Sequence, residues 1–218
     1  MEQQKKINEQ EKKIIAQNLL EDENFSIEVD KCLNPQIQYR KLIHVGKTPN
    51  VLVICGIKNN LNIKMKKSKL IDAMKPEILL ENGRRSHKSG HNLDVETVKK
   101  IPKLMRNPLM VLKGSKDNSL VLITDLKDCK NREILMAINL FQCEDLNKIH
   151  KIDSIYGRDN FNEYLRENIN KGNILAYDKK RTDELLRPIG VDFPAGKKVI
   201  SYDESIAYTF ENVNIGFQ

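Results

Sequence analysis

The chain has 218 residues, of which 39% are apolar and 31% charged, and it contains no tryptophan. No stretch approaches the roughly 20 uncharged apolar residues of a membrane-spanning helix, so we expect none. Isoleucine, leucine and valine recur throughout, which excludes collagen-like and fully disordered chains. The length allows one large domain or two small ones around a sizeable core.

The formal net charge is +7, and the positive excess lies in the middle of the chain. Between Lys58 and Lys116 there are fifteen basic residues and five acidic ones, whereas the remainder is slightly acidic. A basic segment favours a polyanionic partner, most often a nucleic acid. A solvated, lysine-rich surface explains the same charges equally well.

The first part of the chain predicts a polar helix and several short elements. Apolar residues at helical spacing among Gln, Glu and Lys predict a docking or oligomerisation helix over residues 1–24, and Asn34-Pro35 breaks the chain after it. Next come an apolar stretch at 39–45, a run at 51–55 that fits strand or helix, an alternating strand at 61–65 and a short helix within 66–74. Residues 81–92 contain no apolar residue and predict an exposed, mobile loop.

The second part predicts a sheet flanked by helices. Asp94 is a candidate N-cap for a helix over 95–106, which Pro102 kinks or splits. Apolar strands at 109–113, 120–126, 134–140 and 149–156 are joined by short polar turns, which is typical of an antiparallel meander. A helix at 161–169, a strand at 174–177, a helix at 179–186 and alternating pieces at 198–202 and 207–210 follow. This order predicts the α+β class: N-terminal helices packed on a small antiparallel sheet, with helices on one side.

Residues expected in the core share alternating positions on the predicted strands. They are Leu120, Leu122, Ile134, Met136, Ile138 and Ile152. The four cysteines are widely spaced and are expected to be reduced, mostly buried thiols.

Common cofactor and metal motifs are incomplete. Val45–Thr48 matches the end of a phosphate-binding loop, but Lys41 stands where that loop needs a glycine, so we expect no ATP site. His87 and His91 are four residues apart, yet no cysteine or carboxylate cluster accompanies them, so we expect no metal site. No motif for another cofactor is present, and we expect none.

One set of polar residues has the inventory of metal-independent RNA cleavage. Such cleavage needs a base for the 2′-OH proton, an acid for the 5′ leaving oxygen, and cations for the phosphorane. Histidine performs either proton transfer near neutral pH. The candidates are Arg84, Arg85, His87, Lys88 and His91 in the polar loop, and Ser154, Tyr156, Arg158, Tyr177 and Lys179 near predicted strand ends. On composition alone, ordinary surface residues explain this set as well.

Eight segments between Ile43 and Pro194 occur in an informative order. They are VGKTPNVLVICGI (45–57), KSKLIDAM (67–74), HNLDVETVKKIPKLMRNPLMVLKG (91–114), SLVLITDLKD (119–128), ILMAINL (134–140), IDSIYGRDN (152–160), GNILAYDKK (172–180) and GVDFP (190–194). In this order they resemble the C-terminal domain of phage MuF proteins, a domain also found in phage polyvalent proteins.

The resemblance implies a domain over residues 43–194, with an N-terminal helical arm at 1–42 and a C-terminal extension at 195–218. It also implies membership of the barnase, EndoU and RelE-like ribonuclease superfamily (the BECR fold), whose members cleave RNA without metal and leave a 2′,3′-cyclic phosphate. The family's histidine falls on His91, its S-I-Y-G strand on 154–157 and the basic position after it on Arg158. Its Y-x-K-K piece falls on 177–180. The loop before His91 is longer than in the family and carries His87, so which histidine acts stays open.

Together these features predict a ribonuclease or toxin-like effector, encoded by a phage or mobile element, which acts on RNA in the host cytoplasm. The catalytic candidates are His91, Ser154, Tyr156 and Arg158. The RNA-binding candidates are Arg84, Arg85, His87, Lys88, Tyr177 and Lys179. The expected partners are RNA and a host or immunity protein, with no membrane. The alternative is a non-catalytic phage protein that inhibits a host defence nuclease or binds nucleic acid.

Overall fold

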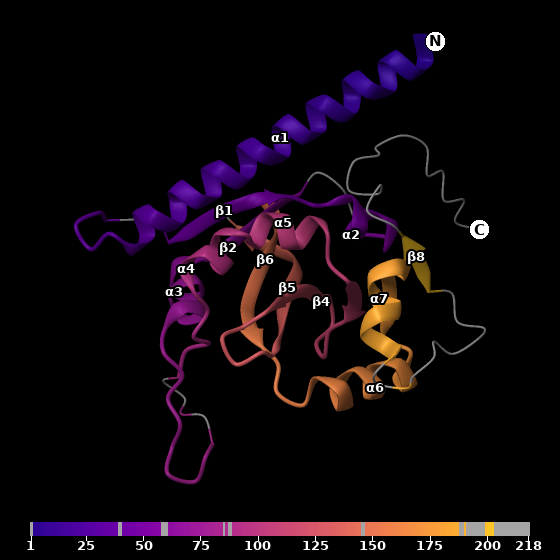
Figure 1. Ribbon diagram of the computed structural model, residues 1–218. Helices are drawn as coiled ribbons and strands as arrows, with labels where there is room; N and C mark the ends of the chain where they lie inside the picture. Colours follow the sequence, from indigo (N-terminus) through magenta and orange to yellow (C-terminus); the bar gives the residue numbers. More distant parts are fainter. Residues whose placement is uncertain are drawn as a thin grey trace.

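A computed structural model describes residues 2–38, 41–57, 61–84, 86, 89–144, 147–187, 190 and 199–202. The chain is α+β, and its long first helix runs across the top of the molecule in Figure 1. In chain order the elements are α1 (Glu2–Leu33), β1 (Leu42–Lys47), α2 (Asn50–Ile54), β2 (Asn62–Lys66), α3 (Lys67–Met74), α4 (Val95–Lys99), α5 (Ile101–Arg106), β3 (Met110–Lys113), β4 (Ser119–Lys127), β5 (Glu133–Glu144), β6 (Asn147–Gly157), α6 (Phe161–Lys171), β7 (Ile174–Asp178), α7 (Lys179–Leu186) and β8 (Ile200–Tyr202).

The strands form one eight-stranded sheet in the order β1-β2-β6-β5-β4-β3-β7-β8. Strands β3 to β6 are the antiparallel meander that the sequence predicts. The sheet extends beyond the small antiparallel sheet expected, because β1 and β2 join one edge and β7 and β8 the other. Two pairs, β2 with β6 and β7 with β8, are parallel. The predicted piece at 207–210 lies outside the described residues.

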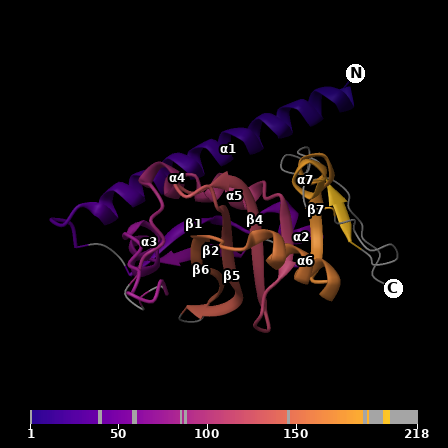
Figure 2. The same cartoon turned by 60° about the horizontal axis from the view of Figure 1, so that its bottom comes forward.

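The sheet is covered on both faces, so the expectation of helices on one side is wrong. On β4, Leu120 and Leu122 belong to one apolar cluster, while Val121 and Ile123 belong to another. Successive strand residues point to opposite faces, so these clusters lie on opposite sides of the sheet. Helices α1, α3, α4 and α5 contribute to the first cluster and α6 to the second. The amphipathic α6 therefore covers part of the face opposite the N-terminal helices (Figure 2).

The core residues expected from strand alternation are all buried. They are Leu120, Leu122, Ile134, Met136, Ile138 and Ile152.

Local sequence signals explain the helices around the first core. The Asp94 carboxylate accepts the backbone N–H of Thr97 at 2.7 Å and caps α4, as predicted. The helix pair breaks at Lys100, which places Pro102 in the first turn of α5, where its missing N–H costs little. Helix α1 extends beyond the predicted 1–24 and ends at Leu33, just before Asn34-Pro35.

The C-terminal half of α1 is part of the core. Phe25, Val29 and Cys32 recur at helical spacing and are buried in the first cluster. Arg106 on α5 donates to Asp22 at 2.6 Å, which ties this helix to the body. Cys32 is also the only buried thiol among the four, so the expectation of mostly buried cysteines is wrong.

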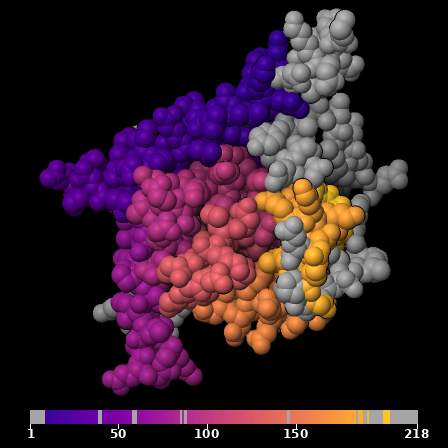
Figure 3. Space-filling view, in the orientation of Figure 1, coloured from indigo at the N-terminus to yellow at the C-terminus, as the bar shows by residue number. Residues whose placement is uncertain are grey.

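A projecting loop, residues 75–84, 86 and 89–92, leaves the body between α3 and α4 and forms a separate lobe at the lower left of Figure 3. Backbone bonds join its two sides, from Leu80 N–H to Arg84 O and from Ser86 N–H to Ile78 O, each at 2.8 Å. Residues 82–84 are exposed, as expected. Gly90 is buried, contrary to expectation, because it packs on Lys75 so closely that a Cβ there would overlap the Lys75 carbonyl.

Candidate functional site

The C-terminal end of β6 carries two of the predicted catalytic residues. Ser154 pairs with Ala137, and Tyr156 pairs with Leu135 on β5. Leu135 belongs to the second apolar cluster, so Ser154 and Tyr156 lie on the face that α6 partly covers. Both side chains are half-buried. Tyr156 packs against the apolar cluster to which α6 contributes.

His91 reaches this position from the base of the projecting loop. Its backbone N–H donates to the Asp72 carbonyl at the end of α3, at 3.0 Å. The imidazole lies against Tyr156, with ring centroids 5.6 Å apart and planes tilted by 39°. Leu93, two residues after His91, is buried and precedes α4. The structure thus brings together a histidine and a tyrosine that are remote in sequence.

Arg158 completes the group from the turn after β6. Its guanidinium lies over the ring of Tyr164 on α6, 4.4 Å from the ring centroid. Burial, with a smaller contribution from Tyr156, raises the pKa of the Tyr164 hydroxyl to about 12, while Arg158 opposes the rise. Tyr164 therefore stays neutral and holds the cation by its face. Its sequence pattern is that of any residue on the buried side of an amphipathic helix, so it gave no signal of a site role.

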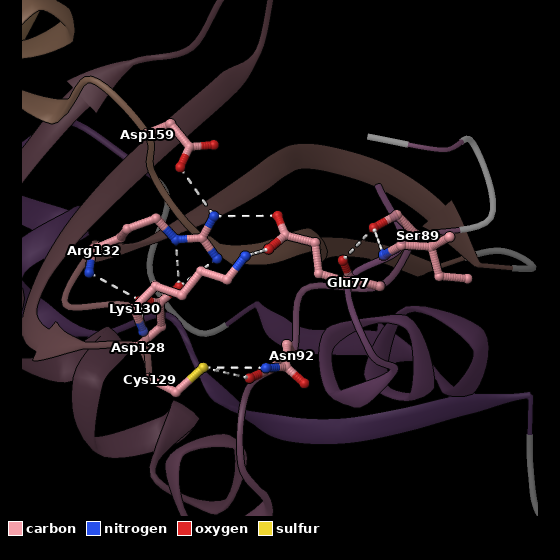
Figure 4. Close-up of polar contacts among 10 residues, drawn as sticks. Glu77, Ser89, Asn92, Asp128, Cys129, Lys130, Arg132 and Asp159 are labelled. Carbon is pink, nitrogen blue, oxygen red and sulfur yellow. Dashed lines mark hydrogen bonds and ion pairs between the residues drawn. The ribbon is translucent and has the colours of Figure 1, made fainter. Parts of the chain in front are cut away.

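The turn between β4 and β5 carries an ion cluster centred on Arg132 (Figure 4). Arg132 donates to Asp128 at 2.6 Å, to Asp159 at 3.0 Å and to Glu77 at 3.2 Å. Lys130 pairs with the same Glu77. Burial alone would raise the pKa of the Asp128 carboxyl, but bonds from Arg132 and two backbone N–H groups outweigh it, so the pKa is lowered. Asp128 is therefore ionised at neutral pH beside the Arg132 guanidinium.

Other predicted residues lie elsewhere. Tyr177 lies in β7 and pairs with Met110 in β3. In the sheet order β7 is four strands from β6, which carries Tyr156, and this separation is about 19 Å at the usual strand spacing. Lys179 opens α7 beyond it and is exposed. Arg84 is exposed near the tip of the projecting loop. The remaining RNA-binding candidates, Arg85, His87 and Lys88, lie outside the described residues.

The open part of the same sheet face is basic. Lys151 on β6 pairs with Asn139 on one side and with Lys64 of β2 on the other, and His44 of β1 pairs with Lys64. This row continues the face of Ser154 and Tyr156 toward the sheet edge. Lys64 also forms an ion pair with Glu144. Sequence reasoning missed Lys64 and Lys151 because the parallel pairing of β2 with β6 joins segments that no local pattern connects.

The electrostatics of this row favour anions. Burial lowers the pKa of the His44 imidazole, and the nearby Lys47 and Lys64 lower it further. The two lysines thus disfavour a positive charge on His44 and attract a negative one. Among the described residues, no cluster of three or more His, Cys, Asp or Glu side chains is arranged to hold a metal ion. No helix in the same part of the chain has the length and apolar content needed to cross a membrane.

Residues 82–184 match the family model of the phage MuF C-terminal domain. The matched range contains His91, Ser154, Tyr156, Arg158 and Arg132, but neither α1 nor the β1–β2 edge. No curated protein and no solved structure matches the chain. The chain is therefore similar to a phage-associated domain over this range. Membership of the ribonuclease superfamily and the boundaries at residues 42 and 194 stay predictions.

Proposed function

We propose that this protein is a phage- or mobile-element-encoded, metal-independent endoribonuclease that acts on host RNA in the cytoplasm. The observation that carries the proposal is the contact of His91 with Tyr156, two residues before Arg158 on the same strand end. A proton-transfer group from the projecting loop thereby meets a hydroxyl at the end of β6, and a cation follows two residues later in the chain. In-line attack by a 2′-OH requires these three groups.

Each residue has a role in the proposed reaction. His91 withdraws the 2′-OH proton or protonates the 5′ leaving oxygen. Arg158, held over the ring of Tyr164, donates to the nonbridging phosphate oxygens, where charge gathers in the transition state. Ser154 and Tyr156 donate hydroxyl hydrogen bonds from the same face. The bond from phosphorus to the 5′ oxygen breaks as the bond to the 2′ oxygen forms, which leaves a 2′,3′-cyclic phosphate.

The basic row supports an approach path for the RNA backbone. Lys64 and Lys151 extend from the His91 group across the open half of the sheet. Phosphate contacts by such lysines supply affinity without sequence information and weaken as salt rises. Tyr177 and Lys179, four strands away, would meet the RNA only beyond this group.

The test is cleavage of purified total RNA in EDTA. The wild type should cut RNA and leave cyclic phosphate ends, and His91→Ala should lower the rate by about 10²–10⁴-fold. His44→Ala is the matched control, because it removes an imidazole from the same face outside the His91 group; its rate should stay within about threefold. Intact RNA, or cleavage only with added Mg²⁺, would overturn the proposal.

A second function, binding and inhibition of a host defence nuclease, is favoured by the projecting loop. Ile78, Leu79 and Leu80 are 47%, 54% and 50% exposed, beside the exposed Arg84. Aliphatic side chains bury well in a protein cleft, whereas RNA bases are recognised mainly by aromatic rings and arginine planes. This function requires a stable complex with a purified host nuclease and no RNA turnover. Leu79→Glu should abolish the complex, whereas Leu19→Glu, on the exposed side of α1, should leave it intact.

A further inference from the structure

We infer that Arg132 is a positioning residue that sets the distance between His91 and Arg158, an inference that rests on the proposed ribonuclease function. Arg132 does not touch either residue in any contact described above. It acts through Asn92 and Asp159, the residues that follow His91 and Arg158. The turn between β4 and β5, which carries Arg132, contacts both of them (Figure 4).

The turn between β4 and β5 grips the segment of His91. The Asn92 amide donates to the Cys129 sulfur at 3.1 Å, directly after His91. Glu77, on the other side of the projecting loop, pairs with both Lys130 and Arg132. The two sides of the loop are bonded to each other, for instance from Gly90 N–H to Pro76 O at 2.9 Å. The turn therefore holds both sides of the base of the projecting loop, and His91 lies on one of these sides.

The same turn grips the segment of Arg158. The Arg132 guanidinium donates to Asp159, directly after Arg158, at 3.0 Å. The Arg158 backbone N–H donates to the carbonyl of Glu133, the residue after Arg132, at 2.9 Å. Gly157 leaves room for this arrangement, since a Cβ there would overlap the Asp128 carboxylate and lie 3.0 Å from Arg132 Nε. One guanidinium thus joins the two segments whose side chains must meet a single phosphate.

Burial and geometry make this link rigid and specific for arginine. The side chains of Arg132, Asp128 and Glu77 are 10%, 1% and 5% exposed. Three carboxylates in three directions match the five donors of a planar fork, which a lysine ammonium cannot reproduce. A shift of about 1 Å between reacting groups is enough to lower a rate by about 10²-fold.

A second arginine offers a matched control. Arg181 on α7 donates to Asp178 at 2.8 Å, to Asp125 at 3.3 Å and to Asn107 at 2.6 Å. Its side chain is 19% exposed. It lies on the β7 side of the sheet, away from β6. Loss of Arg181 thus removes a comparable ion cluster without touching the segments of His91 or Arg158.

The experiment compares Arg132→Gln and Arg132→Lys with Arg181→Gln in the full chain. For both Arg132 variants, kcat for RNA cleavage should fall about 10²-fold with KM within about twofold, and the nuclear Overhauser contact between the His91 and Tyr156 rings should weaken. Arg181→Gln should change neither readout, even where its melting temperature falls as much. Unchanged kcat and ring contact in the Arg132 variants, equal losses in Arg181→Gln, or full rescue by lysine would overturn the inference.

A milder pair covers the case in which Arg132 variants fail to fold. Asp159 and Asp125 are 62% and 47% exposed, and each accepts from one of the two arginines. Asp159→Asn should lower kcat at least threefold and perturb the ring contact, whereas Asp125→Asn should do neither; equal effects would overturn the inference. If wild-type protein cleaves no RNA, the proposed function fails, while the ring contact still decides whether Arg132 positions His91.

Discussion

Replacing Asp128 with asparagine tests the buried ion cluster energetically. The Asp128 side chain is 1% exposed and accepts the backbone N–H groups of Lys130 and Arg132 at 2.9 Å through Oδ1, and Arg132 Nε at 2.6 Å through Oδ2. Asparagine keeps the first oxygen but turns an amide donor toward the guanidinium. The loss of one charge-assisted bond beside a buried cation should lower the free energy of unfolding by about 2–4 kcal/mol.

The effect should depend on pH in a defined direction. The pKa of Asp128 is lowered from 3.8, so its contribution is complete well above pH 3.8 and is lost as the pH falls through the lowered pKa. Urea unfolding of wild type and variant should give a constant difference from pH 6 to 8 that shrinks below about pH 4. Asp125→Asn, whose partner Arg181 is shared with Asp178, should cost at most about 1 kcal/mol. A difference below about 0.5 kcal/mol at pH 7 for Asp128→Asn would refute this account of the cluster.

Three further outcomes follow from burial and packing. Phe25→Ala should cost about 3–5 kcal/mol in urea unfolding because Phe25 is 1% exposed, whereas Leu19→Ala, at a position 64% exposed, should stay within about 0.5 kcal/mol; equal effects would contradict the docking of α1. Cys129 is exposed and should react with a thiol reagent far faster than Cys55, whose pKa burial raises to about 12, and the reverse order would contradict the placement of these thiols. Gly157→Ala should destabilise the protein by at least about 1 kcal/mol through overlap with the carboxylate beneath it, measured by the shift in melting temperature, and an unchanged melting temperature would contradict that packing.

The meander could be predicted because its signals are local. Apolar residues run continuously through β4 and β5, and short polar turns join the strands, so their antiparallel pairing does not depend on distant parts of the chain. The cap at Asp94 and the break near Pro102 are local in the same sense. The presence of helices on both faces of the sheet could not be predicted in this way. The amphipathic pattern of α6 shows that one side of the helix is buried, but it does not show on which face of the sheet the helix packs.

The candidate site was predictable only in part. His91, Ser154, Tyr156 and Arg158 stand out by residue type and by family resemblance, and the structure places them at one end of β6. The Arg132 cluster depends on contacts between the turn and two remote segments, and its residues look like an ordinary polar turn in sequence. Tyr177 and Lys179 have suitable chemistry, but the order of strands separates them from the His91 group.

The most direct test of the central claim compares an RNA oligonucleotide with its fully 2′-O-methylated counterpart in EDTA. Methylation removes the nucleophile that His91 is proposed to activate and leaves the phosphate charges in place. The account predicts cleavage of the unmodified RNA to 2′,3′-cyclic phosphate ends, no cleavage of the methylated RNA, and loss of activity in His91→Ala. Cleavage of both oligonucleotides, cleavage of neither, or full activity in His91→Ala would contradict it.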